Sequence, residues 1–179
     1  MSTLLRDDIV TPRLSLIAIT PEMLLSEKND DGRFGELIRC VVPANWPPEH
    51  WEPHVFEFLL TQLAEHPEQL GWPRYVSLVA SDGQRTLIGT VGAFTKSGRP
   101  NECEIGYSIL PPYEGLGLAT EGAKALIEYL RKEERMESVI AHTFPSLTGS
   151  VRVMQKCGMV LEGEGEEEGT VRYRLRLRD

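Results

Sequence analysis

The first half of the chain has the apolar spacing of one strand and two helices. Alternation with β-branched residues predicts a strand over residues 13–20. Thr20 followed by Pro21 is typical of an N-cap and the first residue of a helix, so a short helix should follow. Apolar residues at helical spacing predict a longer amphipathic helix within residues 46–67, ended near Pro67.

Three apolar runs in the middle of the chain predict an antiparallel meander. The runs over 74–80 and 86–94 are separated by Ser81-Asp82-Gly83-Gln84, whose residue types favour a hairpin turn. A third run over 102–110 follows the turn at residues 96–101 and completes the meander.

The last third of the chain alternates helices and strands. One helical apolar face predicts a helix over 118–130, and a short apolar run predicts a strand over 138–144. A helix over 146–158 should end at Gly158, a natural residue just past a helix C-terminus. Two final strands should flank the acidic, glycine-rich connection at 162–169.

This order of elements predicts a single mixed α+β domain over residues 1–179. The crossover from the strand at 102–110 through the helix to the strand at 138–144 should be right-handed. The fourth and fifth predicted strands should therefore be parallel neighbours.

Composition narrows the classes of partner. The chain has 179 residues, 41% hydrophobic and 26% charged, as in globular proteins with a buried core. A net charge of −8 disfavours nucleic acid as a partner, and no apolar run approaches the ~18–20 residues of a membrane span.

Cys40, Cys103 and Cys157 form no CxxC pair and are odd in number, and residues 1–14 lack a secretory signal pattern. We expect a cytoplasmic protein without a disulfide framework, its cysteines serving as small core residues. A homodimer is compatible with the sequence.

The stretch "ILPPYEGLGLATEG" at residues 109–122 carries the most specific chemical signal. Gly115 and Gly117 allow backbone angles that other residues avoid and let a ligand approach the main chain. The following helix begins with unpaired N–H groups at the positive end of its dipole. These features favour a phosphate site, best matched by a diphosphate, over a corner that merely turns the chain.

The corner does not fit two common nucleotide motifs. Thr120 replaces the third glycine of a dinucleotide-binding fingerprint, and His142 and Thr143 stand where an acidic residue would be needed. No lysine follows the glycines, as a triphosphate-binding loop would require.

"EIGYSILPPYEGLGLATEGAKALIEYL" and "VIAHTFPSLTGSVRVMQKCGMVLEGEG" resemble the GNAT superfamily of acyl-CoA N-acyltransferases, closest to its RimJ/RimL-like branch. The resemblance covers residues 86–177, and "WPPE" at 46–49 also resembles that branch. It implies acetyl-CoA, bound between the fourth and fifth strands, which separate at a bulge. The implied diphosphate-binding residues are Gly115, Gly117, Leu118, Ala119 and Thr120, with the pantetheine arm pairing near Ile109 and Leu110.

The chain departs from the family pattern at three positions. Glu114 stands where the family motif begins with glutamine or arginine, and Leu116 replaces a common basic residue. Leu147 replaces an asparagine that helps to order the cofactor arm. A carboxylate at position 114 is expected to weaken diphosphate binding unless it turns to solvent or pairs with a cation.

Acyl transfer to an amine needs a proton acceptor, a stabilised carbonyl oxygen and a proton for the departing thiolate. Glu104 is the candidate base, with Glu162 in reserve; a structural strand glutamate is the alternative for Glu104. Ser150 resembles the serine proposed as the acid in ribosomal-protein acetyltransferases, and a helix N-cap is its alternative role. A backbone N–H near Leu110 is a candidate for stabilising the carbonyl oxygen.

Other side chains are secondary candidates. A phenol for the thiolate could come from Tyr107, Tyr113 or Tyr173, although a packing role is more typical of each. Two basic residues of the last helix, Arg152 and Lys156, either contact a 3′-phosphate of the cofactor or lie in solvent. His50 and His54 lack the pattern of a zinc site, and we expect no metal. The acidic connection should be an exposed hairpin loop, and the tryptophans either pack or line the acceptor side.

The sequence therefore predicts an acetyl-CoA-dependent N-acetyltransferase that acts by direct attack of a primary amine. The acceptor is expected to be a peptide N-terminus or a small molecule, and the negative charge mildly favours a cationic one. The alternative is a non-catalytic or regulatory acyl-CoA-binding module with the same fold.

Overall fold

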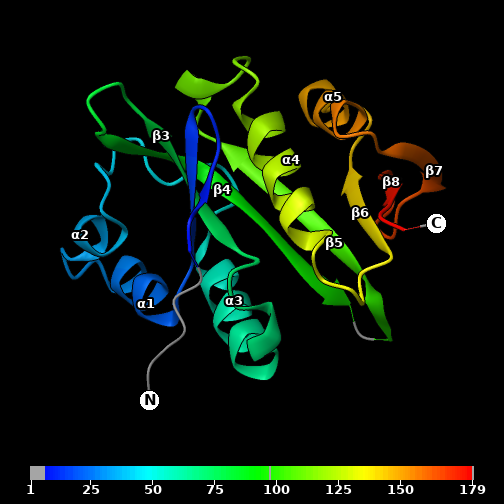
Figure 1. Ribbon diagram of the computed structural model, residues 1–179, viewed down its shortest axis with the longest axis horizontal. Helices are drawn as coiled ribbons and strands as arrows, with labels where there is room; N and C mark the ends of the chain where they lie inside the picture. Colours follow the sequence, from blue (N-terminus) through cyan, green and yellow to red (C-terminus); the bar gives the residue numbers. More distant parts are fainter. Residues whose placement is uncertain (1–6, 97, 179) are drawn as a thin grey trace.

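A computed structural model describes residues 7–96 and 98–178 (Figure 1). The sequence-based expectation of no secretory signal falls partly on residues 1–6, which lie outside the described residues.

Most of the described chain forms strands and helices that follow the predicted order. The strands are β1 (Ile9–Val10), β2 (Leu14–Ala18), β3 (Arg74–Val79), β4 (Arg85–Lys96), β5 (Arg99–Ile109), β6 (Ser138–Thr143), β7 (Val160–Glu164) and β8 (Val171–Arg176). The helices are α1 (Pro21–Asn29), α2 (Phe34–Ile38), α3 (Pro53–Glu65), α4 (Leu118–Leu130) and α5 (Thr148–Lys156), with short 3₁₀ turns η1 (Pro67–Gln69) and η2 (Pro111–Tyr113).

The strands form one eight-stranded sheet in the order β1-β2-β3-β4-β5-β6-β8-β7. The predicted meander of β3, β4 and β5 is confirmed, and so is the parallel pairing of β5 with β6. All other neighbouring strands are antiparallel. The mixed α+β fold class predicted from the sequence is therefore correct.

β5 and β6 stay paired over only a short distance. Residues 102–104 of β5 face residues 138–140 of β6, and beyond these positions both strands continue without pairing to each other. This is the separation of strands that the family resemblance implied. The implied bulge is not present on β5, whose register with β4 is unbroken from Cys103 to Ile109. The strands thus diverge without an extra residue in β5.

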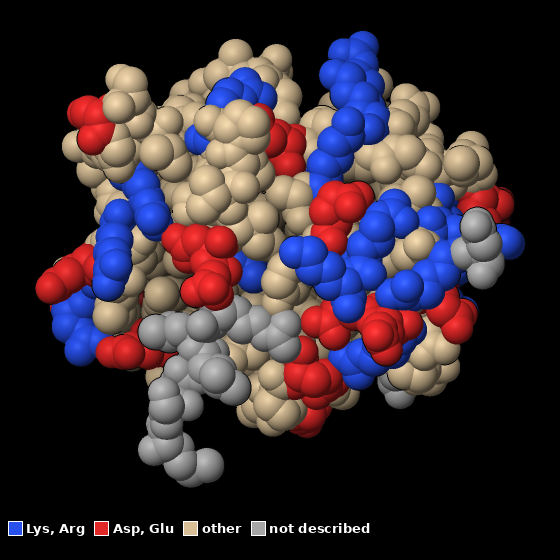
Figure 2. Space-filling view, viewed as in Figure 1, with Lys and Arg blue, Asp and Glu red and all other residues tan. Residues whose placement is uncertain are grey.

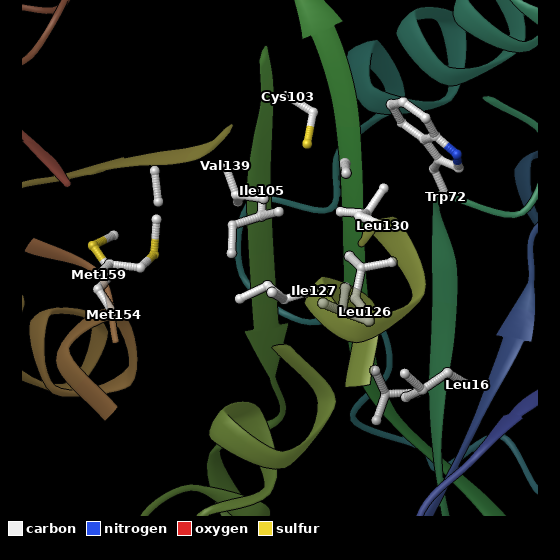
Figure 3. Close-up of a cluster of buried hydrophobic side chains, with 14 of the residues drawn as sticks. Leu16, Trp72, Cys103, Ile105, Leu126, Ile127, Leu130, Val139, Met154 and Met159 are labelled. Carbon is white, nitrogen blue, oxygen red and sulfur yellow. The ribbon is translucent and has the colours of Figure 1, made fainter. Parts of the chain in front are cut away.

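Each face of the sheet has its own hydrophobic core. Because side chains alternate along a strand, Leu14 and Leu16 of β2 face α4, whereas Ile17 belongs to the core formed with α1, α2 and α3. The larger core also contains Trp72 and Cys103, together with Leu126, Ile127 and Leu130 of α4 (Figure 3). In Figure 1, α4 lies across β4 and β5, and α5 lies beside β6. Packing on both faces explains why all of β2 is buried.

Local signals explain where the helices begin and end. The Thr20 side chain accepts a hydrogen bond from the Met23 amide at 3.3 Å, which confirms the predicted N-cap. Gly158, with φ of 81°, follows α5 as predicted. The short β1 and α2 were not predicted, because two and five residues are too few to show a periodic pattern. Among the residues that the structure describes, none of the helices combines the length and the hydropathy of a membrane span.

Candidate functional site

A cleft of about 650 Å³ opens where β5 has separated from β6. Its walls are residues 107–109 of β5, the glycine corner with the first turn of α4, and one side of α5 with the two residues before it. The N-termini of both helices therefore face the same cavity, and their dipoles favour a negatively charged ligand there.

The glycine corner presents bare backbone to this cleft. Gly115 and Gly117 have φ values of 73° and 78°, in the left-handed region that favours glycine. A Cβ built on Gly115 would meet no atom within 4 Å, so the backbone there is open. Gly117 is the N-cap of α4 and provides no side-chain cap. No hydrogen bond among the described residues occupies the N–H groups of Gly115 or of residues 117–120, which leaves them free for an acceptor.

Six of the seven expected cofactor-binding residues line the cleft, and the seventh does not. Ile109, Gly115, Gly117, Leu118, Ala119 and Thr120 lie in its wall. Leu110 is buried outside the cleft, and its amide donates to the Ile88 carbonyl at 2.8 Å. The expectation that Leu110 pairs with a pantetheine arm or stabilises an oxyanion is therefore wrong. Since amides alternate between the edges of a strand, the backbone of Ile109 and Tyr107 faces the open side instead.

Ser150 lies in the first turn of α5, and its hydroxyl faces that of Tyr107 across 3.2 Å. Tyr107 also donates to the Ser150 carbonyl at 3.0 Å, and burial raises the pKa of Tyr107 to about 12. The N-cap of α5 is Leu147, so the alternative role of Ser150 as a cap is wrong. Both hydroxyls lie in the wall of the cleft.

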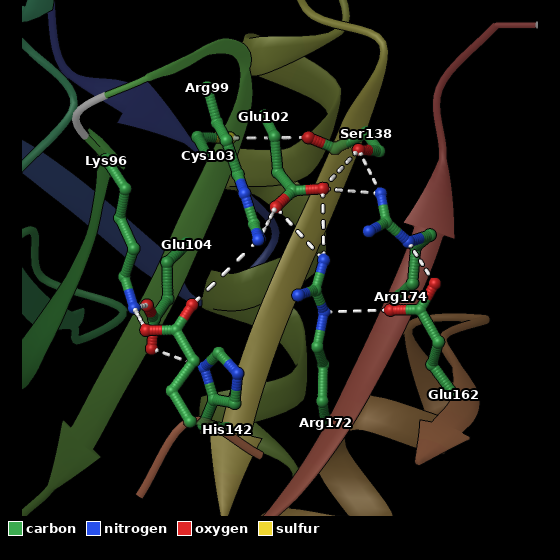
Figure 4. Close-up of polar contacts among 11 residues, drawn as sticks. Lys96, Arg99, Glu102, Cys103, Glu104, Ser138, His142, Glu162, Arg172 and Arg174 are labelled. Atoms are coloured by element: carbon green, nitrogen blue, oxygen red, sulfur yellow. Dashed lines mark hydrogen bonds and ion pairs between the residues drawn. The ribbon is translucent and has the colours of Figure 1, made fainter. Parts of the chain in front are cut away.

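Glu104 is at the last position of β5 that pairs with β6 (Figure 4). Its side chain is on the opposite face of the sheet from Tyr107, because the two positions are three residues apart along the strand. Its carboxylate lies 2.9 Å from Nδ1 of His142 and 2.8 Å from Nζ of Lys96. Glu166, from the connection between β7 and β8, also contacts Lys96. The sequence did not indicate His142 or Lys96 as partners, since β4, β5 and β6 bring them together only in the fold.

The His142 imidazole is closed off on its other side. Its Nε2 is shielded from solvent and has no hydrogen-bond partner among the described residues. A Cβ on Gly165 would lie 3.0 Å from His142 Cδ2, so the β7–β8 connection packs against the ring. The acidic connection thus covers one edge of the Glu104–His142 pair.

The reserve base, Glu162, is held by two arginines. Arg174 and Arg172 each contact its carboxylate, at 2.7 and 2.8 Å, and also contact Glu102 (Figure 4). The hydrogen bond from Arg174 is the main reason that the pKa of Glu162 is lowered. This carboxylate lies outside the cleft, which favours a structural role over that of a base.

The secondary candidates divide by position. Tyr113, Arg152 and Lys156 line the cleft, as do Glu114 and Leu147, whereas Tyr173 is buried in the core. Lys and Arg side chains gather over the half of the molecule that carries α5 and the C-terminal strands (Figure 2). Two of the basic residues of the described chain, Arg152 and Lys156, lie in the wall of the cleft.

A cation that supports the glycine corner comes from a distant part of the chain. In the structure Arg13, about a hundred residues earlier, donates from Nη1 to the Leu116 carbonyl at 3.0 Å. Its Nε also contacts Glu121 of α4 at 2.7 Å. Only the pairing of β2 within the sheet brings Arg13 to this place, so no local motif could have revealed it.

The histidines, tryptophans and cysteines described next lie outside the lining of the cleft. His50 and His54 are exposed, and the described residues contain no cluster of side chains suited to a metal ion. Trp72 is fully buried in the core, and the indoles of Trp46 and Trp51 donate to Glu27. Cys103 is buried, which raises its pKa to about 12, and the described cysteines are free thiols.

Comparison with known proteins identifies the family. Residues 33–160 match the family model described as Acetyltransferase (GNAT) domain. Because this match covers well over half of the chain, the protein belongs to the GNAT acetyltransferase family. The resemblance seen in the sequence is confirmed.

Two curated relatives from Bacillus subtilis (strain 168) match part of the chain. The uncharacterized N-acetyltransferase YnaD is 40% identical over 77 residues, which are 43% of this chain and 45% of the relative. The probable N-acetyltransferase YjcK is 30% identical over 105 residues, which are 58% and 57% of the two chains. The chain thus spans about half the length of the curated relatives it matches.

A solved structure shows the same fold over nearly the whole chain. RimL, a ribosomal L7/L12 alpha-N-protein acetyltransferase in complex with coenzyme A, aligns with a TM-score of 0.64 and 14% identity. The alignment covers 95% of this chain and 98% of RimL.

Proposed function

We propose that this protein is an N-acetyltransferase that transfers an acetyl group from acetyl-CoA to a primary amine by direct attack. The observation that carries the proposal is the row of unoccupied amides at Gly115 and residues 117–120, which faces the cleft beside the separated β5 and β6. Family membership and the names of the two curated relatives support the same activity.

The cleft fits the chemistry of coenzyme A. A diphosphate accepts several N–H groups at once, and the corner presents such groups without side chains in front of them. The free edge of β5 at Tyr107 and Ile109 suits the amide-containing pantetheine arm, which can bind as an added strand. Arg152 and Lys156 would lie near the remaining phosphate. When bound, acetyl-CoA supplies an acetyl group activated as a thioester.

Glu104 is proposed to accept the proton of the attacking amine. Its position on the face opposite the coenzyme cleft lets the amine approach from one side of the sheet while coenzyme A occupies the other. The His142 hydrogen bond fixes the carboxylate beside the gap between β5 and β6. The Lys96 ammonium group lies between the carboxylates of Glu104 and Glu166 and contacts both of them.

Ser150 and Tyr107 are proposed to stabilise the departing sulfur. A tyrosine with a pKa of about 12 holds its proton at neutral pH but is a weaker acid than a thiol, whose ordinary pKa is about 8.5. The pair therefore acts as a hydrogen-bond donor to the sulfur rather than as a strong acid. Because Tyr107 donates to the Ser150 carbonyl, the Ser150 hydroxyl is the group free to turn toward the cleft.

The acceptor is proposed to be a peptide N-terminus or a small-molecule amine of cationic character. The carboxylates of Glu104 and Glu166 both contact Lys96 near the gap, and Glu166, Glu167 and Glu168 of the β7–β8 connection are exposed. RimL is named for a protein N-terminal substrate, which illustrates one of these two acceptor types on the same fold.

A thiol-release assay tests this function. Purified protein is mixed with acetyl-CoA and a panel of primary amines and peptides, while free thiol and acetylated amine are measured. We expect thiol release that depends on at least one amine. Coenzyme A binding without thiol release from any amine would favour the non-catalytic module, and no binding of coenzyme A would contradict both.

A further inference from the structure

One side chain from the N-terminal part of the chain holds the outer side of the glycine corner. The Arg13 guanidinium donates from Nη1 to the Leu116 carbonyl at 3.0 Å and from Nε to Glu121 at 2.7 Å. The Arg13 backbone amide also donates to Glu121 at 3.0 Å, and the Thr11 hydroxyl donates to the same carboxylate at 2.6 Å. Arg13 itself does not line the cleft.

The contact with Leu116 determines which way the next amide points. In a trans peptide the C=O of one residue and the N–H of the following residue point in opposite directions. Arg13 holds the Leu116 carbonyl on the outer side of the corner, so the Gly117 N–H is directed away from Arg13. Gly117 lies in the cleft wall, which places that N–H on the cleft side. A guanidinium on the carbonyl also polarises the peptide and makes its N–H a better donor.

Arg13 also counters the negative charge at this corner. Glu121 lies in the first turn of α4, close to the place proposed for a diphosphate. Burial alone would raise the pKa of Glu121, but hydrogen bonds from Thr11 and Arg13 outweigh it, and the pKa is lowered. Glu121 is therefore ionised at neutral pH and needs a partner. Glu114 adds a second carboxylate in the cleft wall, and neither Leu116 nor another corner residue supplies a cation.

We propose that Arg13 is a positioning residue for the diphosphate-binding corner. It directs the Gly117 N–H into the cleft through the Leu116 carbonyl and neutralises Glu121 behind the same amides. It thereby cancels, from outside the corner, a negative charge that would otherwise lie behind the diphosphate-binding amides. This inference rests on the proposed function only in taking coenzyme A as the ligand.

The test compares a ligand that carries the diphosphate with a ligand that lacks it. Coenzyme A binding to wild type and to Arg13→Met is measured by calorimetry, and pantetheine binding is measured by ligand-observed NMR. Pantetheine has the same arm but lacks both the diphosphate and the 3′-phosphoadenosine. We expect Arg13→Met to weaken coenzyme A binding about tenfold, the scale of one charge-assisted hydrogen bond, and to leave pantetheine unchanged. Arg33→Met is the matched control, because Arg33 is also an exposed arginine paired with an acidic residue, Glu22.

A second variant and a ligand-free measurement keep the test decisive. Arg13→Lys keeps the charge but loses the planar fork that reaches Leu116 and Glu121 together, so an intermediate loss of affinity is expected. It replaces Arg13→Met if that variant does not fold. In the free protein, either variant should shift the Gly117 amide resonance more than the amide resonances of the last two turns of α4.

Three outcomes would overturn the inference. These are unchanged coenzyme A affinity, an equal loss for both ligands, or an unmoved Gly117 resonance. If wild type binds no coenzyme A, the proposed function fails separately, while the Gly117 resonance still decides whether Arg13 positions the corner.

Discussion

Glu104 and His142 join β5 to β6 by a side-chain hydrogen bond of 2.9 Å at the point where the backbone ladder between these strands ends. Glu104 is opposite Ile140, the last paired residue of β6, and His142 is two residues further along. The pair thus fixes the base of the gap between the strands. Lys96 reaches the same carboxylate from β4, so three adjacent strands hold one group in place.

Glu104→Gln should lower the rate of acetyl transfer about a hundredfold at neutral pH, which is the usual contribution of a general base. The loss should shrink at high pH, where more of the amine is already deprotonated. Coenzyme A affinity should hardly change, because the side chain lies on the opposite face from the cleft. Steady-state kinetics over a pH range and calorimetry check both parts. Full activity at neutral pH would remove Glu104 as the base.

Glu114→Gln should tighten coenzyme A binding. Glu114 lines the cleft next to Gly115, and an exposed carboxylate there repels a diphosphate through solvent. The gain should be several-fold at low salt and smaller at high salt, because salt screens exposed charges. Glu134→Gln, an exposed glutamate beyond the end of α4, is the control. Unchanged or weaker affinity in calorimetry would show that Glu114 does not act on the ligand.

Tyr107 should make the protein less stable in strong alkali. Burial raises its pKa to about 12, whereas an unfolded tyrosine has a pKa of about 10. The unfolded chain therefore loses the proton first, and the free energy of unfolding falls as pH rises through this window. The contribution is complete below about pH 10 and is lost by about pH 12. Urea denaturation at several pH values should show a shallower decline for Tyr107→Phe than for wild type, and identical slopes would contradict this.

Glu27→Gln should lower the free energy of unfolding by about 1–3 kcal/mol, the range for loss of buried charged hydrogen bonds. The Glu27 carboxylate accepts from the indoles of Trp46 and Trp51 at 2.7 and 2.8 Å and from the Tyr75 hydroxyl. An amide cannot accept on both sides in the same way. Urea denaturation followed by tryptophan fluorescence measures the change.

The control for this variant is Glu22→Gln, which alters an exposed carboxylate of the same helix. It should change the free energy of unfolding by less than about 0.5 kcal/mol. Equal effects of the two variants would show that the contacts with the aromatic side chains add no specific stability.

Much of the fold could be predicted because its signals are local. The cap at Thr20, the turn at residues 81–84 and the apolar face of α4 each depend on neighbouring residues, and each appears in the structure. The glycine corner is local too, since two positive φ values and a following helix define it. For the same reason six of the seven expected cofactor-binding positions line the cleft.

The remaining features depend on contacts between distant segments. Arg13 meets Leu116 because β2 lies in the sheet under α4, and His142 meets Glu104 because β6 pairs with β5, although each pair is far apart in the sequence. Lys96 reaches Glu104 across the β4–β5 hairpin, where the pairing register decides which side chains meet. Leu110 was assigned wrongly because its amide is taken by Ile88 of β4, which residue types cannot reveal. The orientation of a backbone group depends on strand pairing rather than on its own side chain.

The most direct test of this account is a crystal structure of the protein with coenzyme A. The account predicts the diphosphate within hydrogen-bond distance of the amides of Gly115, Gly117 and Leu118, with the pantetheine arm along the free edge of β5. Coenzyme A bound elsewhere, or those amides occupied by other parts of the protein, would contradict it.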